Sequence, residues 1–106
     1  MDITASELKE RLENGDDLHL LDVRSELEYH TFNIGGLNIP LPKLNHEIVE
    51  LDWNKNDEII VICKVGMRSN TGKLILQQNG YTNVKNLKGG LIALQKSDSK
   101  HQQNND

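Results

Sequence analysis

The segment from Glu58 to Cys63 reads Glu-Ile-Ile-Val-Ile-Cys, and the segment from Lys64 to Ser69 reads Lys-Val-Gly-Met-Arg-Ser. The consecutive branched aliphatic residues predict a strand, and the absence of alternating polar residues indicates that both faces of this strand are buried. Strands of this kind lie in the middle of parallel sheets that helices cover on both sides. At Cys63 the hydrophobic run stops, so the strand is expected to end there and a loop to begin.

The rest of the chain alternates between helical and extended patterns around this strand. Thr4 to Glu7 reads Thr-Ala-Ser-Glu, which is a capping box, and Asn14-Gly15 ends the helix that the box begins. Further helices are expected over residues 25–29, 42–51, 70–79 and 91–95, and strands over 18–23, 37–39, 58–63 and 84–87. This order predicts an α/β fold with a small central parallel sheet flanked by helices on both faces.

The length of 106 residues suits one compact domain, which we place at residues 1–96. Residues 97–106 contain no apolar side chain and are expected to form a disordered polar tail. No segment resembles a signal peptide, and the longest apolar run is far shorter than a membrane span. We therefore expect a cytoplasmic protein that does not bind membranes.

Charge and cysteine content exclude several other classes of protein. The formal net charge of −4 argues against a nucleic-acid partner, because phosphate binding needs clustered Lys and Arg. The chain has a single cysteine, which cannot form an intramolecular disulfide, and its four histidines are scattered. We expect no metal site and no cofactor.

The loop after Cys63 favours an ionised thiol. A helix that follows the loop would direct its positive end toward the sulfur, and a tight loop points successive backbone N–H groups inward. Lys64 and Arg68 add positive charge, Gly66 permits a tight turn, and Ser69 is expected to cap the helix and donate to the sulfur. These features predict a lowered thiol pKa and a reactive Cys63. The alternative is that Cys63 is only a small hydrophobic residue at the end of a buried strand.

Four motifs in this order resemble the rhodanese homology family. Residues 20–24 (Leu-Leu-Asp-Val-Arg) resemble a strand end of the family, and residues 28–41 resemble its next conserved segment. Residues 63–69 resemble its active-site loop, Cys-x-x-Gly-x-Arg-Ser, and residues 80–90 its closing segment. The resemblance implies a rhodanese-like fold and a sulfurtransferase in which Cys63 carries sulfur as a persulfide.

The resemblance also assigns roles to other residues. The backbone of the loop would cradle the sulfur; its members are Lys64, Val65, Gly66, Met67, Arg68 and Ser69. Asp22 and Arg24 would lie close by in supporting roles. For Arg24, a contact with substrate and a purely structural ion pair both remain open. Family members specialised for thiosulfate carry additional cations where this chain has Val65 and Glu28, which puts thiosulfate in doubt as the donor.

Two other functions compete with sulfur transfer. Phosphatases of the same fold need Cys-x5-Arg to surround a phosphoryl group, whereas Cys63 and Arg68 form Cys-x4-Arg, a loop better suited to one sulfur atom. The other alternative is a noncatalytic or sulfur-relay module that binds a partner protein. Inactive family members usually lack the Cys or the loop signature, and both are present here, so a purely noncatalytic role is not favoured, although partner binding can accompany catalysis. The expected partners are a small sulfur donor (thiosulfate, a polysulfide or a persulfide) and an acceptor, which is a thiol, cyanide or a sulfur-carrier protein.

Overall fold

The computed structural model of the chain describes residues 2–104, with side chains described through Ser97. Four parallel strands form one sheet in the order β2-β1-β3-β4. Their bounds are β1 (His19–Asp22), β2 (Leu37–Asn38), β3 (Ile59–Ile62) and β4 (Val84–Asn86). β3 lies between β1 and β4, and its residues are 0% exposed, which confirms the prediction of a central strand buried on both faces.

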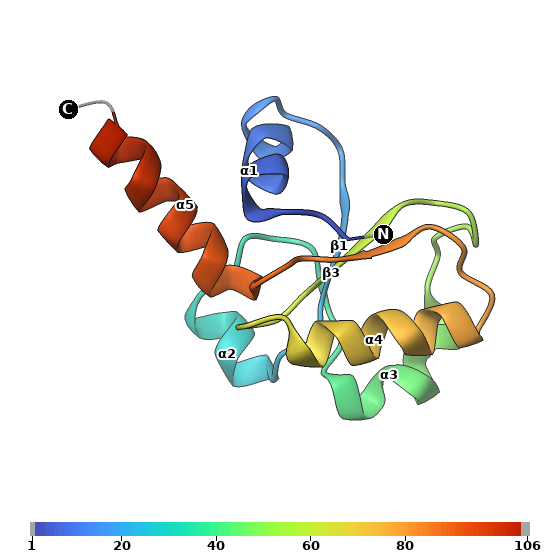
Figure 1. Cartoon of the computed structure of the whole chain (residues 1–106). Helices are drawn as coiled ribbons and strands as arrows, with labels where there is room; N and C mark the ends of the chain where they lie inside the picture. Colours follow the sequence, from blue (N-terminus) through green and yellow to red (C-terminus); the bar gives the residue numbers. More distant parts are fainter. Residues whose placement is uncertain (1, 105–106) are drawn as a thin grey trace.

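Helices cover both faces of the sheet, as predicted (Figure 1). Their bounds are α1 (Ala5–Glu13), α2 (Glu26–Thr31), α3 (Leu41–Glu47), α4 (Met67–Gln78) and α5 (Gly90–Asn104), and the 3-10 turn η1 (Ile48–Glu50) continues α3. α1 and α5 lie on one side of the sheet, and α3 and α4 lie on the other (Figure 1). The architecture is therefore an α/β sandwich of three layers.

Alternate residues of β1 and β3 supply two separate hydrophobic cores. Leu20 and Ile60 pack with α1 and α5, whereas Leu21 and Val61 pack with α3 and α4. Cys63 continues the second pattern, so its side chain lies on the face that α4 covers. This register places the sulfur beside the first turn of α4.

Local sequence signals account for most of the helix boundaries. Both predicted capping boxes are present: Thr4 with Glu7 begins α1, and Ser25 with Glu28 begins α2. Gly15, which follows the end of α1, has a φ of 78°, a conformation that glycine adopts without strain.

Several helix boundaries differ from the prediction, and α3 ends at Glu47, with the 3-10 turn η1 in place of its last predicted turn. α4 begins at Met67 rather than near residue 70, because Gly66, with a φ of 101°, forms the N-cap and lets the helix start at once. α5 continues to Asn104 rather than ending near residue 95, and no glycine or proline interrupts this part of the sequence. The sequence predicts a disordered tail over residues 97–106. In the structure, residues 97–104 belong to α5, and residues 105 and 106 lie outside the described part of the chain. Among the described residues, no helix combines the length and hydrophobicity needed to cross a membrane.

Candidate active site

The candidate site lies at the carboxyl end of β3, where residues 63–66 connect the strand to α4. Cys63 is the last buried residue of this segment, and its side chain has 0% exposure. Its sulfur accepts the backbone N–H of Gly66 at 3.0 Å and that of Ser69 at 3.3 Å. The peptides after Cys63 therefore turn toward the sulfur, as expected for an anion-binding loop.

Hydrogen bonds lower the pKa of the Cys63 thiol despite its burial. Burial has the largest single effect and raises this pKa, but four hydrogen bonds together outweigh it. The donors are the hydroxyl and the N–H of Ser69 and the N–H groups of Gly66 and Val65. The thiol is thus more acidic than an ordinary cysteine, and ionisation makes it the stronger nucleophile.

Ser69 acts on the sulfur directly rather than as a helix cap. The predicted cap is wrong, because Ser69 is the third residue of α4 and is fully buried. The predicted contact with sulfur is confirmed, since the Ser69 hydroxyl lies 3.2 Å from the sulfur of Cys63. The hydroxyl also donates to Oδ1 of Asn86, and because it has a single proton, it can donate fully to only one of these two neighbours at a time.

Asn86 is a buried residue of the site that the sequence analysis missed. It ends β4, and its Nδ2 donates to the carbonyl of Gly66 at 3.3 Å while its Oδ1 accepts from Ser69. One amide therefore holds Gly66 and Ser69, two of the residues whose N–H groups donate to the sulfur. A polar side chain at the carboxyl end of a parallel strand is a signal that could have identified Asn86 from the sequence.

The start of α5 anchors the other side of the loop. The N–H of Leu91 donates to the carbonyl of Cys63 at 2.9 Å, and the N–H of Ile92 donates to the carbonyl of Lys64 at 3.1 Å. These two donors belong to the first turn of α5, where backbone N–H groups have no partner within the helix. The loop is thereby fixed to three elements: β4, α4 and α5.

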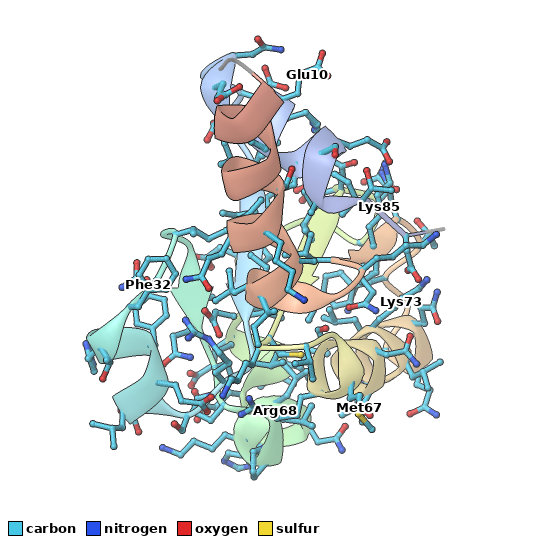
Figure 2. The ribbon with its side chains drawn as sticks, turned by 60° about the vertical axis from the view of Figure 1, so that its left-hand side comes forward. Glu10, Phe32, Met67, Arg68, Lys73 and Lys85 are labelled. Carbon is cyan, nitrogen blue, oxygen red and sulfur yellow. The ribbon has the colours of Figure 1, made fainter. Side chains whose placement is uncertain are left out.

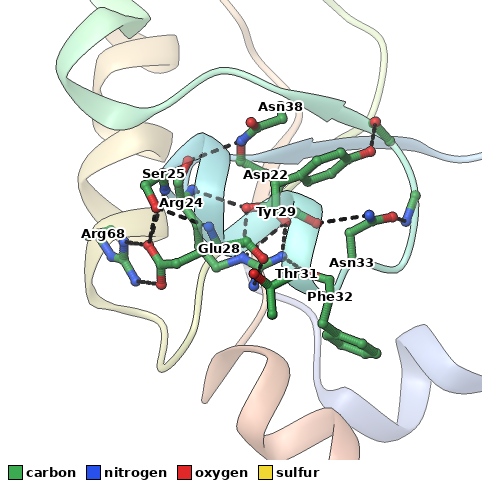
Figure 3. Close-up of polar contacts among 12 residues, drawn as sticks. Asp22, Arg24, Ser25, Glu28, Tyr29, Thr31, Phe32, Asn33, Asn38 and Arg68 are labelled. Atoms are coloured by element: carbon green, nitrogen blue, oxygen red, sulfur yellow. Dashed lines mark hydrogen bonds and ion pairs between the residues drawn. The ribbon is translucent and has the colours of Figure 1, made fainter.

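Arg68 is paired with a carboxylate of α2. Its two terminal nitrogens contact the carboxylate oxygens of Glu28 at 2.7 and 3.0 Å (Figure 3). Arg68 lowers the pKa of Glu28 to about 2, so this carboxylate is ionised throughout the neutral range. The pKa of Arg68 is raised, chiefly by Glu28 and to a smaller extent by the charge of Cys63. Of the two predicted positive charges beside the sulfur, that of Arg68 is therefore largely balanced.

Asp22 and Arg24 form a buried ion pair at the carboxyl end of β1, next to the loop. Nη2 of Arg24 contacts the carboxylate of Asp22 at 2.7 Å, and the two side chains are 7% and 0% exposed. Arg24 also donates to the carbonyls of Glu28 and Phe32, which holds the middle and the carboxyl end of α2 (Figure 3). Of the two roles left open for Arg24, these contacts favour the structural one.

Comparison with known proteins places this arrangement in a family. The model of the Rhodanese-like domain matches residues 4–97. The chain is 40% identical over 74 residues to the thiosulfate sulfurtransferase PspE of Escherichia coli, an alignment that covers 69% of this chain and 70% of that protein. It is 31% identical to a sulfurtransferase of Allochromatium vinosum, over 87% of this chain and 85% of that one. The chain belongs to the rhodanese-like domain family.

A solved structure agrees with this assignment. The fold superposes on that of SSP1007 from Staphylococcus saprophyticus with a TM-score of 0.76 and 31% identity, covering 88% of this chain and 91% of the other. The α/β fold and the family predicted from the sequence are thus confirmed. The chain is a rhodanese-type sulfurtransferase, an enzyme that takes sulfur from a donor and passes it to an acceptor.

A groove of about 360 Å³ opens beside the loop of this sulfurtransferase, between α2 and the start of α5. Its lining residues are Arg24, Leu27, Glu28, Thr31, Phe32, Lys64, Leu91, Ile92 and Gln95. The two remaining loop side chains, Val65 and Met67, are 49% and 77% exposed and are not part of this lining. Figure 2 shows Phe32 beside α2 and Met67 at the start of α4, with Arg68 between these two helices. Within the described part of the chain, no group of three or more His, Cys, Asp or Glu side chains is placed to hold a metal ion.

Replacing Ser69 with alanine is expected to move the pKa of the Cys63 thiol upward, because the thiolate loses a hydrogen bond from the hydroxyl. Alkylation by iodoacetamide reports this pKa cleanly, since Cys63 is the only cysteine and the rate rises with the ionised fraction. The midpoint of the rate against pH should therefore shift to higher pH. Thr71→Ala removes an exposed hydroxyl from the same helix and should leave the midpoint unchanged. Equal midpoints for Ser69→Ala and the unmodified chain would contradict the assigned hydrogen bond.

Proposed function

We propose that Cys63 is the nucleophile of this sulfurtransferase and carries the transferred sulfur as a persulfide. The observation that supports this most directly is the convergence of the Gly66 N–H, the Ser69 N–H and the Ser69 hydroxyl on one sulfur atom. Hydrogen-bond donors that are in place before the reaction stabilise negative charge on sulfur without further rearrangement. The same N–H and O–H groups that stabilise the thiolate are placed to stabilise an anionic persulfide.

The first half of the cycle is a displacement at sulfur. The thiolate of Cys63 attacks the outer sulfur of a donor R–S–SH, and a bond forms between the two sulfur atoms. The bond between R–S and the outer sulfur breaks, so that R–S⁻ leaves with the electron pair and Cys63 carries –S–SH. The rate of this step depends on the thiolate fraction and on the pKa of the leaving thiol.

The second half returns the enzyme to its starting state. An acceptor thiolate or cyanide attacks the outer sulfur of the persulfide, and the Cys63 thiolate is the leaving group. Its lowered pKa assists this departure as well as the first attack. Because the Cys63 side chain is fully buried, side chains over the sulfur must move locally before a donor or acceptor can reach it.

No contact in the described part of the chain supports a phosphatase or a noncatalytic module. In a phosphatase, the loop arginine would have to bind the phosphoryl oxygens, but the Arg68 guanidinium is already paired through two hydrogen bonds with Glu28. A purely noncatalytic module would not need converging donors around a thiol of lowered pKa. Phosphatase activity on p-nitrophenyl phosphate is accordingly expected to be absent.

Mass spectrometry of the intact chain tests the proposal. After exposure to a polysulfide or an organic persulfide, we expect a gain of one sulfur, about 32 Da, that dithiothreitol removes. Cys63→Ser should show no gain, and cyanide should convert the loaded protein to the free form with release of thiocyanate. Failure of every donor to load the unmodified chain, or loading of Cys63→Ser, would overturn the assignment.

A further inference from the structure

The groove beside the loop combines an apolar lining with an almost balanced set of charges. Leu27 and Phe32 on one side face Leu91 and Ile92 on the other, so the body of a bound donor would meet hydrocarbon. Lys64 directly follows Cys63 in the chain and also lines the groove. A donor held in this groove therefore lies next to the residue that carries the reactive sulfur.

Three cations lie around the groove, and two of them are neutralised. Arg24 is paired with Asp22, and Arg68 is paired with Glu28 through two hydrogen bonds. Lys64 is exposed and has no ion pair with any described residue. Among the described side chains around the groove, Lys64 is thus the one cation without a carboxylate partner on the approach to an ionised Cys63.

This balance affects donors according to their charge. When thiosulfate reacts, a dianion approaches a thiolate, and the encounter brings three negative charges together. An organic thiosulfonate reacts as Cys63–S⁻ + R–SO₂–S⁻ → Cys63–S–S⁻ + R–SO₂⁻, which brings together only two negative charges. Because Coulomb energy is proportional to the charge of the donor, the carboxylate of Glu28 should oppose a dianion twice as strongly as a monoanion.

We propose that Glu28 is a specificity-determining residue, which masks Arg68 and thereby favours donors with an apolar body and at most one negative charge. This inference rests on the proposed transfer of sulfur through Cys63. It identifies the preferred donor class as an organic compound with a sulfane sulfur, such as an organic persulfide or thiosulfonate. The carboxylate that selects the donor is held on α2, and its partner guanidinium is held on α4.

The variant Glu28→Gln removes the charge with little change of structure. Glutamine at this position retains the capping box with Ser25, because Gln replaces Glu in this motif without loss of the reciprocal hydrogen bond. Sulfur transfer to cyanide can be followed by the formation of thiocyanate with the full chain. In this assay, we expect kcat/KM for thiosulfate to rise about tenfold and kcat/KM for benzenethiosulfonate to rise about threefold. Added salt should reduce the gain for thiosulfate more than the gain for benzenethiosulfonate.

Glu26→Gln is the matched control, because it makes the same charge change on the same helix. Glu26 pairs with Lys43 and is not among the lining residues of the groove, so the ratio of the two donors should stay constant. For the apolar lining, Leu27→Ala should lower kcat/KM for benzenethiosulfonate about fivefold and that for methanethiosulfonate by less.

Two outcomes separate this inference from the proposed function. If thiosulfonates load Cys63 but Glu28→Gln changes all donors equally, or no more than Glu26→Gln does, then Glu28 does not determine specificity. If no donor loads Cys63 in the unmodified chain, the proposed sulfur transfer itself fails.

Discussion

Gly90→Ala is expected to destabilise the fold by about 3 kcal/mol and to abolish most sulfur transfer. Gly90 begins α5 with a φ of 64°, and a Cβ built there would lie 2.6 Å from the carbonyl oxygen of Cys63 and closer still to the carbonyl of Lys64. Both obstacles are backbone atoms of the candidate site, so they cannot turn away as a side chain could. The loop must shift, and the hydrogen bond from Leu91 to the Cys63 carbonyl is lost with it.

Urea unfolding followed by the fluorescence of Trp53 measures the loss of stability, since this single tryptophan packs against the core beneath α3 and α4. Gly15→Ala is the matched control. Gly15 has a similar φ of 78°, but a Cβ there would meet no atom within 4 Å. Gly15→Ala should lower the free energy of unfolding by about 1 kcal/mol, because alanine is strained in the left-handed conformation, and it should leave sulfur loading intact. Equal losses of stability in Gly90→Ala and Gly15→Ala would show that close packing of α5 against the loop does not limit the residue at position 90.

Asp22→Asn is expected to lower the free energy of unfolding by about 3 kcal/mol. The change leaves the guanidinium of Arg24, whose side chain is 7% exposed, without its carboxylate. A buried charge that loses its partner keeps its desolvation cost without the compensating attraction. Arg24 also holds the carbonyls of Glu28 and Phe32, so α2 and the lining of the groove should loosen as well.

A second substitution in the same chain distinguishes the lost pair from a general packing defect. Arg24→Met in the Asp22→Asn background removes the unpaired charge and should recover at least half of the lost stability, because apolar replacements of buried ion pairs are often neutral. Glu26→Gln, which breaks an exposed ion pair with Lys43, should change stability by less than about 0.5 kcal/mol. If the double variant is less stable than Asp22→Asn alone, the attribution to an unpaired charge is wrong.

Several features of this protein could be predicted from short stretches of sequence. The uninterrupted aliphatic run of β3 indicated a strand buried on both faces, and Thr4 with Glu7 indicated the start of α1. These signals are local, because a hydrophobic pattern or a capping box acts within a few residues along the chain. The loop from Cys63 to Ser69 could be recognised for the same reason, since all its donors lie within six residues of the sulfur.

The boundary of α4 shows where local reasoning failed. The sequence places Ser69 at or near the start of the helix and predicts that it caps the helix, but the φ of 101° at Gly66 allows the helix to begin at Met67 with Gly66 as the N-cap. The hydroxyl of Ser69 therefore points into the site, where Cys63 and Asn86 surround it. A small shift of the helix start thus changed the role of a residue while its identity as a site residue stayed the same.

The sequence by itself determined the α/β class, the order of the strands and helices, and the position of the thiol in its loop. Only the tertiary structure showed that Asn86 holds the loop, that Glu28 neutralises Arg68, and that α5 binds the carbonyl of Cys63. The partners in these contacts are separated by 20 residues for Asn86 with Gly66 and by 40 residues for Arg68 with Glu28. Such contacts depend on the packing of distant elements around the sheet, and no local pattern of residues encodes them.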